Sequence, residues 1–124
     1  MWNQAVNRNN YTANETISGI TFTNNQDGSI TASGTSTSVA VHEMGAINNS
    51  FFIIGHKYYV YTGFSSVGSS TTFEFMILKG NGNSNNWNAY TNKIFSITST
   101  NSSNKLVRFV IRSGVTVSNL RLYP

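Results

Sequence analysis

The sequence contains no cysteine and only one proline among its 124 residues. Without cysteine there can be no disulfide framework and no thiolate metal site. Charged residues make up only 10% of the chain, and asparagine, serine, threonine and glycine fill most polar positions. A disordered chain would instead combine low hydrophobicity with high net charge. The composition is typical of extracellular or virion β-proteins, which stay soluble through uncharged polar groups.

Long apolar runs are also missing. No stretch approaches 18 apolar residues, so the sequence predicts no membrane insertion. The opening residues "MWNQAVNRNN" lack the apolar segment of a signal peptide. The length fits one domain, which we expect over residues 16–124, after an N-terminal lead or linker at 1–15. The two chain ends suggest a domain excised from a longer protein.

The net charge is +4, from eight basic and four acidic residues. The basic residues are spread along the chain, whereas a nucleic-acid-binding protein concentrates them in a patch or stripe. The sequence therefore does not favour nucleic acid as a partner.

Strand patterns dominate the chain, and the fold class that they predict is all-β. Short alternating segments separated by glycine, asparagine and serine number about eight, which indicates a two-sheet antiparallel sandwich. The expected strands include "SFFIIG", read as a short buried run, and "TTFEFMILK". Around "AVHEMGA" we expect a turn. The clearest local prediction is a hairpin over residues 17–36, closed by Asp27-Gly28, a pair that tolerates positive φ in a tight turn.

Three segments together resemble a known family. They are "GITFTNNQDGSITASGTST", "HKYYVYTGFSSVGSSTTFEF" and "VRFVIRSGVTVSNLRLYP", in that order. They are similar to the small carbohydrate-binding-module-like β-sandwich domains of tail and baseplate proteins in phages and prophages of Gram-positive bacteria. The resemblance spans residues 16–124 and is weak at 39–55 and 79–101.

The resemblance implies a jelly-roll sandwich on a phage virion or outside the cell. Its implied partners are a saccharide of the bacterial cell surface and the other domains of the parent tail protein. It also implies that Tyr59 and Tyr61 point inward and Tyr58 outward. The matched motifs are mostly structural, so the resemblance does not fix the binding residues.

The segment "GNGNSNNWNAYTN" provides the first candidate site, in a region that the resemblance does not match. Trp87 and Tyr90 are large rings in a segment otherwise rich in amides such as Asn86 and Asn88. An aromatic ring can stack on the C–H face of a sugar while amides bond its hydroxyls. Three roles for Trp87 stay open, which are a sugar platform, a protein contact, and a plug over one end of the sandwich.

The second candidate site is one face of a sheet. Glu74 shares a strand face with Met76 and Leu78, and Arg108 shares one with Arg112. If these strands are neighbours, Glu74 and an arginine could line a groove and bind sugar hydroxyls. We favour the alternative, a salt bridge on a solvated sheet, which would contribute about 0–1 kcal/mol.

Catalysis and metal binding find little support. A glycosidase needs two carboxylates flanking the scissile bond, and only Glu43 and Glu74 are candidates. His42-Glu43 has no further ligand at metal-binding spacing. The carboxylates are too scattered for a calcium site made of side chains, which leaves open a calcium ion bound largely by backbone carbonyls. We therefore expect a non-catalytic domain with no cofactor and no metal. The main alternative to sugar binding is a structural module that contacts other proteins.

Overall fold

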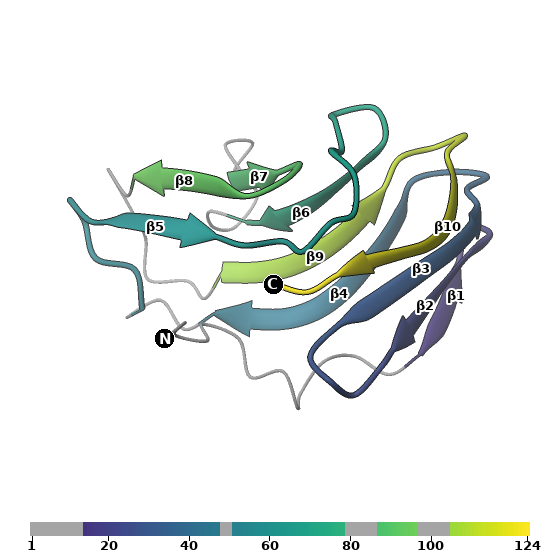
Figure 1. Ribbon diagram of the computed structural model, residues 1–124, viewed down its shortest axis with the longest axis horizontal. Helices are drawn as coiled ribbons and strands as arrows, with labels where there is room; N and C mark the ends of the chain where they lie inside the picture. The colour runs from purple at the N-terminus through teal and green to yellow at the C-terminus, as the bar shows by residue number, and fades with distance from the viewer. Residues whose placement is uncertain (1–13, 48–50, 79–86, 97–104) are drawn as a thin grey trace.

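The computed structural model describes residues 14–47, 51–78, 87–96 and 105–124. These residues form no α-helix and ten β-strands. The strands pair into three antiparallel sheets (Figure 1). Their bounds are β1 (Glu15–Ile17), β2 (Ile20–Asn24), β3 (Ile30–Thr35), β4 (Ala40–Ile47), β5 (Lys57–Val60), β6 (Phe73–Ile77), β7 (Trp87–Ala89), β8 (Lys93–Ser96), β9 (Lys105–Ile111) and β10 (Thr116–Leu122).

The first four-stranded sheet has the order β1-β2-β3-β10. Its strands alternate as a half-buried sheet requires. In β2, Ile20 and Phe22 are fully buried, while Thr21 is exposed between them. The outer face is made largely of threonine and serine, β-compatible residues that stay polar without charge. This explains how a chain with few charged residues still presents a solvated surface.

The second four-stranded sheet has the order β4-β9-β6-β7. Phe75 lies opposite Phe109, and Ile77 lies opposite Val107 on the same inner face. The two sheets meet through Phe22, whose ring packs edge-on against that of Phe109 at a centroid distance of 5.5 Å. Burying a side chain of this size contributes about 1.5–3 kcal/mol, so these contacts form a substantial core between the sheets.

The remaining strands, β5 and β8, form a two-stranded ribbon. Its inner face, which includes Tyr58 and Phe95, packs over the β6–β7 end of the second sheet through Phe52 and Trp87. The ribbon is joined to β10 where the Tyr123 N–H donates to the Thr62 carbonyl at 2.7 Å. The ribbon and the first sheet therefore cover the same side of the second sheet, in a sandwich-like arrangement.

Two segments differ from the sequence-based expectations. Residues 40–46, where a turn is predicted, belong to β4, with Ala40, His42 and Met44 buried. The pattern is hard to recognise because the register shifts between Glu43 and Gly45 and because a histidine fills a core position. The run "SFFIIG" is not a strand, and its Ile53 and Ile54 are exposed.

The hairpin predicted over residues 17–36 is confirmed as β2 and β3, but the predicted tight turn is wrong. Five residues join the strands, with positive φ at Gln26 and Gly28. The Asp27 side chain accepts from the Ser29 N–H instead, which is a local turn bond typical of aspartate. The expected boundary at residue 16 falls inside β1. No helix within the described ranges is long and apolar enough to cross a membrane.

Candidate functional site

The outer face of the second sheet gathers four of the six residues that the sequence suggests as binding residues. Met76 lies opposite Asn88 of β7 on one side and opposite Arg108 of β9 on the other. Glu74 shares this face because it is two residues from Met76, and it interacts with the Tyr90 side chain. Glu74, Asn88, Tyr90 and Arg108 are thus brought together. Asn86 lies outside the described residues.

Two ion pairs occupy this face, and one of them joins Glu74 to an arginine, as the sequence suggests. Glu74 pairs with Arg112, whereas Arg108 pairs with Glu43 at 2.6 Å. The Glu74 side chain is fully buried, so the expected salt bridge on a solvated sheet is wrong for this pair. Burial raises the pKa of Glu74 above its ordinary value, against the opposing effects of Arg112 and of the hydrogen bond from Tyr90.

The polar groups of this face are engaged with one another or enclosed. One oxygen of Glu74, Oε2, and the Oδ1 atom of Asn88 are buried without a hydrogen-bond partner. Such atoms cost free energy, but because they are enclosed they do not present themselves to a passing ligand. This face therefore serves mainly to hold β6, β7 and β9 together.

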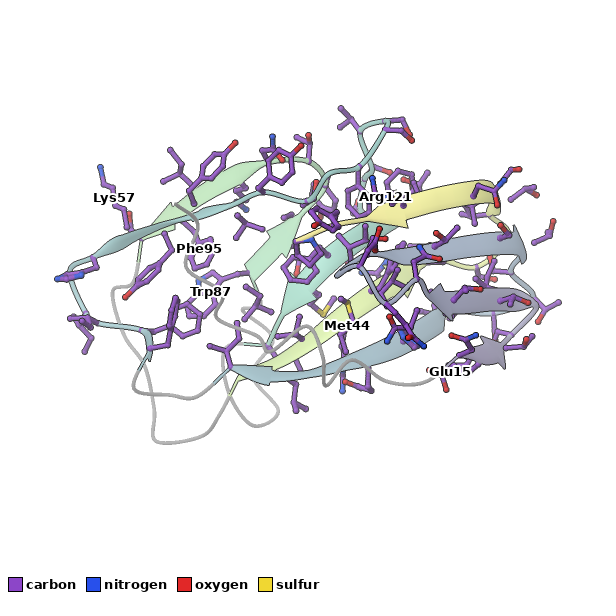
Figure 2. All side chains as sticks on the ribbon, turned by 60° about the horizontal axis from the view of Figure 1, so that its bottom comes forward. Glu15, Met44, Lys57, Trp87, Phe95 and Arg121 are labelled. Carbon is purple, nitrogen blue, oxygen red and sulfur yellow. The ribbon has the colours of Figure 1, made fainter. Side chains whose placement is uncertain are left out.

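Trp87, the most prominent candidate in the sequence, packs inward. It lies opposite Ile77 on the inner face of the sheet. Its ring stacks on that of Phe95, with the centroids 4.9 Å apart and the planes at 20°. The centroid of the Phe52 ring lies 5.2 Å from that of Trp87. Figure 2 shows Trp87 and Phe95 close together beneath the two-stranded β5–β8 ribbon. Of the three roles left open, the geometry favours the plug, and we leave Trp87 out of the proposed site.

The tyrosines of the ribbon lie opposite to what the resemblance implies. Tyr58 is partly buried, and its hydroxyl donates to the Phe51 carbonyl and accepts from the Ile53 N–H, both at 2.9 Å. Tyr59 and Tyr61 are 46% and 45% exposed. The inward prediction for these two is wrong. The exposed Lys57 shows which side chains of this segment point outward. Since side chains alternate between the two faces of a strand, every second residue after Lys57 lies on its outer side.

A third tyrosine continues this outer row. Tyr123 lies beside Gly63, where a Cβ atom would come within 2.9 Å of the Tyr123 Cβ. The missing side chain of Gly63, a residue close to Tyr61 in the chain, thus leaves room for Tyr123. Arg121 lies over the Tyr123 ring at 4.8 Å from its centroid, a cation–π contact. We call Tyr59, Tyr61 and Tyr123 the tyrosine row.

The surroundings of the tyrosine row are accessible. Outer positions on an extended segment are spaced by about 6.6 Å, so Tyr59 and Tyr61 are neighbours on the outer side, and Tyr123 lies near them beside Gly63. Ile94, opposite Tyr59 on β8, is 63% exposed. In Figure 2, Lys57 lies at the end of the ribbon far from β10, and Arg121 lies on β10. The arrangement offers apolar ring faces next to polar and charged groups. The sequence contains the signal for it, in the alternation that starts at Lys57.

His42 has a structural position. Its ring stacks on Phe22 at 4.8 Å with planes at 8°, and its Nδ1 atom lies 2.5 Å from Glu15 Oε1. Glu43 points to the opposite face of β4, where it meets Arg108. Within the part of the chain that the structure describes, no three histidine, aspartate or glutamate side chains gather as metal ligands.

Comparisons with known families, proteins and structures find no match to this chain: no family model matches it, and neither a curated protein nor a solved structure does.

Proposed function

We propose that the chain is a non-catalytic carbohydrate-binding module that attaches a phage or prophage tail protein to saccharide on the surface of its host. It would act on the virion or outside the cell. The observation that supports this most is the tyrosine row, with half-exposed rings on β5 and directly after it, and a third ring beside Gly63. Among the described phenylalanine, tyrosine and tryptophan residues, only Tyr59 and Tyr61 are exposed, and large rings left half in water suit a binding surface.

The chemistry of sugars fits such a surface. A pyranose ring presents C–H groups on its faces and hydroxyls on its edge. The tyrosine rings can stack on the faces, while tyrosine hydroxyls, Lys57 and Arg121 can bond the edge. Bonds to hydroxyls replace bonds to water, so the affinity of one site would be about mM to μM. Several copies on one particle would raise it.

We further propose a jelly-roll arrangement for the sandwich. The ribbon and the first sheet would form one layer, of order β1-β2-β3-β10-β5-β8. The second sheet would form the other. The bond between Tyr123 and Thr62 supports this continuity. In such a layer the tyrosine row crosses the junction between ribbon and sheet, so a sugar chain could extend along both.

The proposal is tested by titrating the protein with host-wall polysaccharide or with a glycan array. Replacing Tyr59 and Tyr61 together by alanine should weaken binding by about tenfold or more, since ~1.4 kcal/mol corresponds to a factor of ten. The matched variant with phenylalanine at both positions keeps the rings and should bind within about threefold of the parent protein. If the alanine variant binds as well as the parent, the tyrosine row is not the site.

A second function has one observation in its favour. Ile53, Ile54 and Ile94 are exposed aliphatic side chains on or next to the ribbon, and they have no stacking role toward sugars. Exposed apolar side chains of this kind suit a contact with another protein. The module would then be a structural spacer that binds neighbouring subunits. Failure to bind any glycan, together with loss of a subunit contact in Ile94→Asn, would favour this function.

A further inference from the structure

The distribution of charge differs between the two broad faces of the molecule. The chain has four carboxylates. Three of them form ion pairs with arginine, which are Asp27 with Arg121, Glu43 with Arg108, and Glu74 with Arg112. The fourth, Glu15, contacts the ring of His42. The outer face of the second sheet holds two carboxylates and two arginines, so its described charges cancel.

The face with the tyrosine row is different. Lys57 shares its outer side with Tyr59 and Tyr61, and among the described residues no carboxylate lies within ion-pair distance of it. Arg121 lies at the other end of the row, stacked on Tyr123. The only side-chain carboxylate that the described ion pairs place next to the row is Asp27, 3.3 Å from Arg121. The described side chains of this face therefore carry two positive charges against one negative charge.

Asp27 leaves part of Arg121 available. Its Oδ1 atom accepts from both the N–H and the hydroxyl of Ser29, and these bonds lower the pKa of Asp27. Only Oδ2 faces Arg121, and both side chains of this pair are about half exposed, at 52% and 54%. A guanidinium has five N–H donors in a fork. Arg121 can therefore bond a ligand anion while it keeps Asp27.

From this arrangement we propose that the ligand of the tyrosine row is an anionic glycopolymer, whose acidic groups meet Lys57 and Arg121 while its rings lie over the tyrosines. The inference rests on the proposed function and specifies its ligand class. At about 3.3 Å per residue along the strands, the two cations are roughly 25 Å apart. A ligand that reaches both must be several sugar units long. The acidic groups can be carboxylates or phosphates.

The test uses one polymer in charged and neutral form. Oligomers of polygalacturonate provide the carboxylate, their methyl esters provide the same backbone without charge, and poly(glycerol phosphate) provides the phosphate source. We expect at least one of the two anionic polymers to bind, and the esters to bind at least about fivefold more weakly. Raising the salt from about 20 mM to about 300 mM should weaken anionic binding, because the screening length shortens from roughly 20 Å to less than 10 Å.

Two variants assign the effect to this face. Lys57→Gln should weaken binding of the anionic polymer about two- to fivefold at low salt and should leave binding of the ester unchanged. Lys93→Gln is the matched control, because Lys93 lies on the inner side of the same ribbon with its Nζ atom donating to the Asn88 carbonyl. It removes the same charge and should change binding by less than about twofold.

The outcomes separate the two proposals. Equal affinity for ester and acid, independent of salt, would overturn the anionic ligand and leave sugar binding in place. If Lys57→Gln and Lys93→Gln lose the same affinity for the anionic polymer, the net charge of the protein explains the binding and no particular face is needed. That result would also overturn the inference. No binding to any glycan in any form would overturn the proposed function itself.

Discussion

Trp87 and Phe95 stack face to face, at a centroid distance of 4.9 Å, although they belong to different sheets. Trp87 comes from the edge strand of the second sheet, and Phe95 comes from the ribbon that covers it. With Phe52 and Tyr58 they form an aromatic cluster that fixes the ribbon to the sheet. The tyrosine row lies on the other side of this ribbon, so the cluster positions the proposed binding surface.

Trp87→Ala should therefore lower stability and leave glycan affinity nearly unchanged when both are measured on folded protein. Truncating a buried aromatic residue costs about 3–5 kcal/mol, and for this partly buried ring we expect the lower end of that range. Urea unfolding measures the stability. Trp87→Phe, which keeps part of the stacking, should cost less. A large loss of glycan affinity at full stability would show that the indole contacts the ligand after all.

Glu74 should make the stability depend on pH with a definite sign. Burial raises the pKa of its carboxyl in the folded state. Between the ordinary glutamate value of about 4.3 and the raised value, the folded protein binds more protons than the unfolded chain. The unfolding free energy should then fall as the pH rises through this window. Urea unfolding from about pH 4 to about pH 7 measures this contribution.

The variant Glu74→Gln should remove this contribution from the pH profile, whatever its effect on absolute stability. The control is Glu43→Gln, which removes a carboxylate from the same sheet face but from a half-exposed position. It should leave the contribution of Glu74 in place. A Glu74-dependent rise of stability with pH would contradict the predicted direction.

Gly19 should not tolerate a side chain because the backbone of Thr35 lies too close, and this effect can be separated from the strain of its backbone angle. Its φ is +85°, and a Cβ atom there would lie 2.3 Å from the Thr35 carbonyl oxygen. Gly55 has nearly the same φ, +89°, but nothing lies within 4 Å of its Cβ position. Gly55→Ala should cost about 1 kcal/mol from backbone strain alone, and Gly19→Ala clearly more. Equal destabilisation in thermal unfolding would mean that the approach to Thr35 does not matter.

Ser36 should be important for the connection between the sheets. It is buried, and its hydroxyl donates to the Arg112 carbonyl and accepts from the Val115 N–H at 2.9 Å. Ser36→Ala leaves buried backbone groups without this partner and should cost about 1–3 kcal/mol. The exposed Ser38, which bonds only Ser18 among the described contacts, is the control, and Ser38→Ala should be nearly neutral in urea unfolding. Similar losses for both would contradict this role.

The sequence predicts the all-β class and the β2–β3 hairpin because alternation of apolar and polar residues is regular there. It misses β4 because His42 occupies a core position, where it is stacked on Phe22 and bonded to Glu15. Neither partner is close to His42 in the sequence. Alternation in β4 is also interrupted at Gly45, which has a φ of +132°.

The candidate site could be predicted only in part. Glu74 and Arg108 do come to neighbouring strands. Glu74 lies opposite Val110, equally far in register from Arg108 and Arg112. It pairs with Arg112, while Glu43 of β4 pairs with Arg108. The phase of a strand decides whether an aromatic ring points in or out. Trp87 points inward because it lies opposite the apolar Ile77 of the adjacent strand. Tyr59 points outward because it is two residues from the charged, exposed Lys57 on its own strand.

Tyr123 contributes in two ways. Its ring belongs to the tyrosine row, and its N–H donates to the Thr62 carbonyl and so joins the segment after β5 to the end of β10. If the proposed function holds, a pull along β10 would reach the polymer through one residue. Because β5 and β10 run in opposite directions (Figure 1), the load would act along the strands and shear the junction. The proposed function therefore implies that the junction between ribbon and sheet sets the mechanical strength of the attachment.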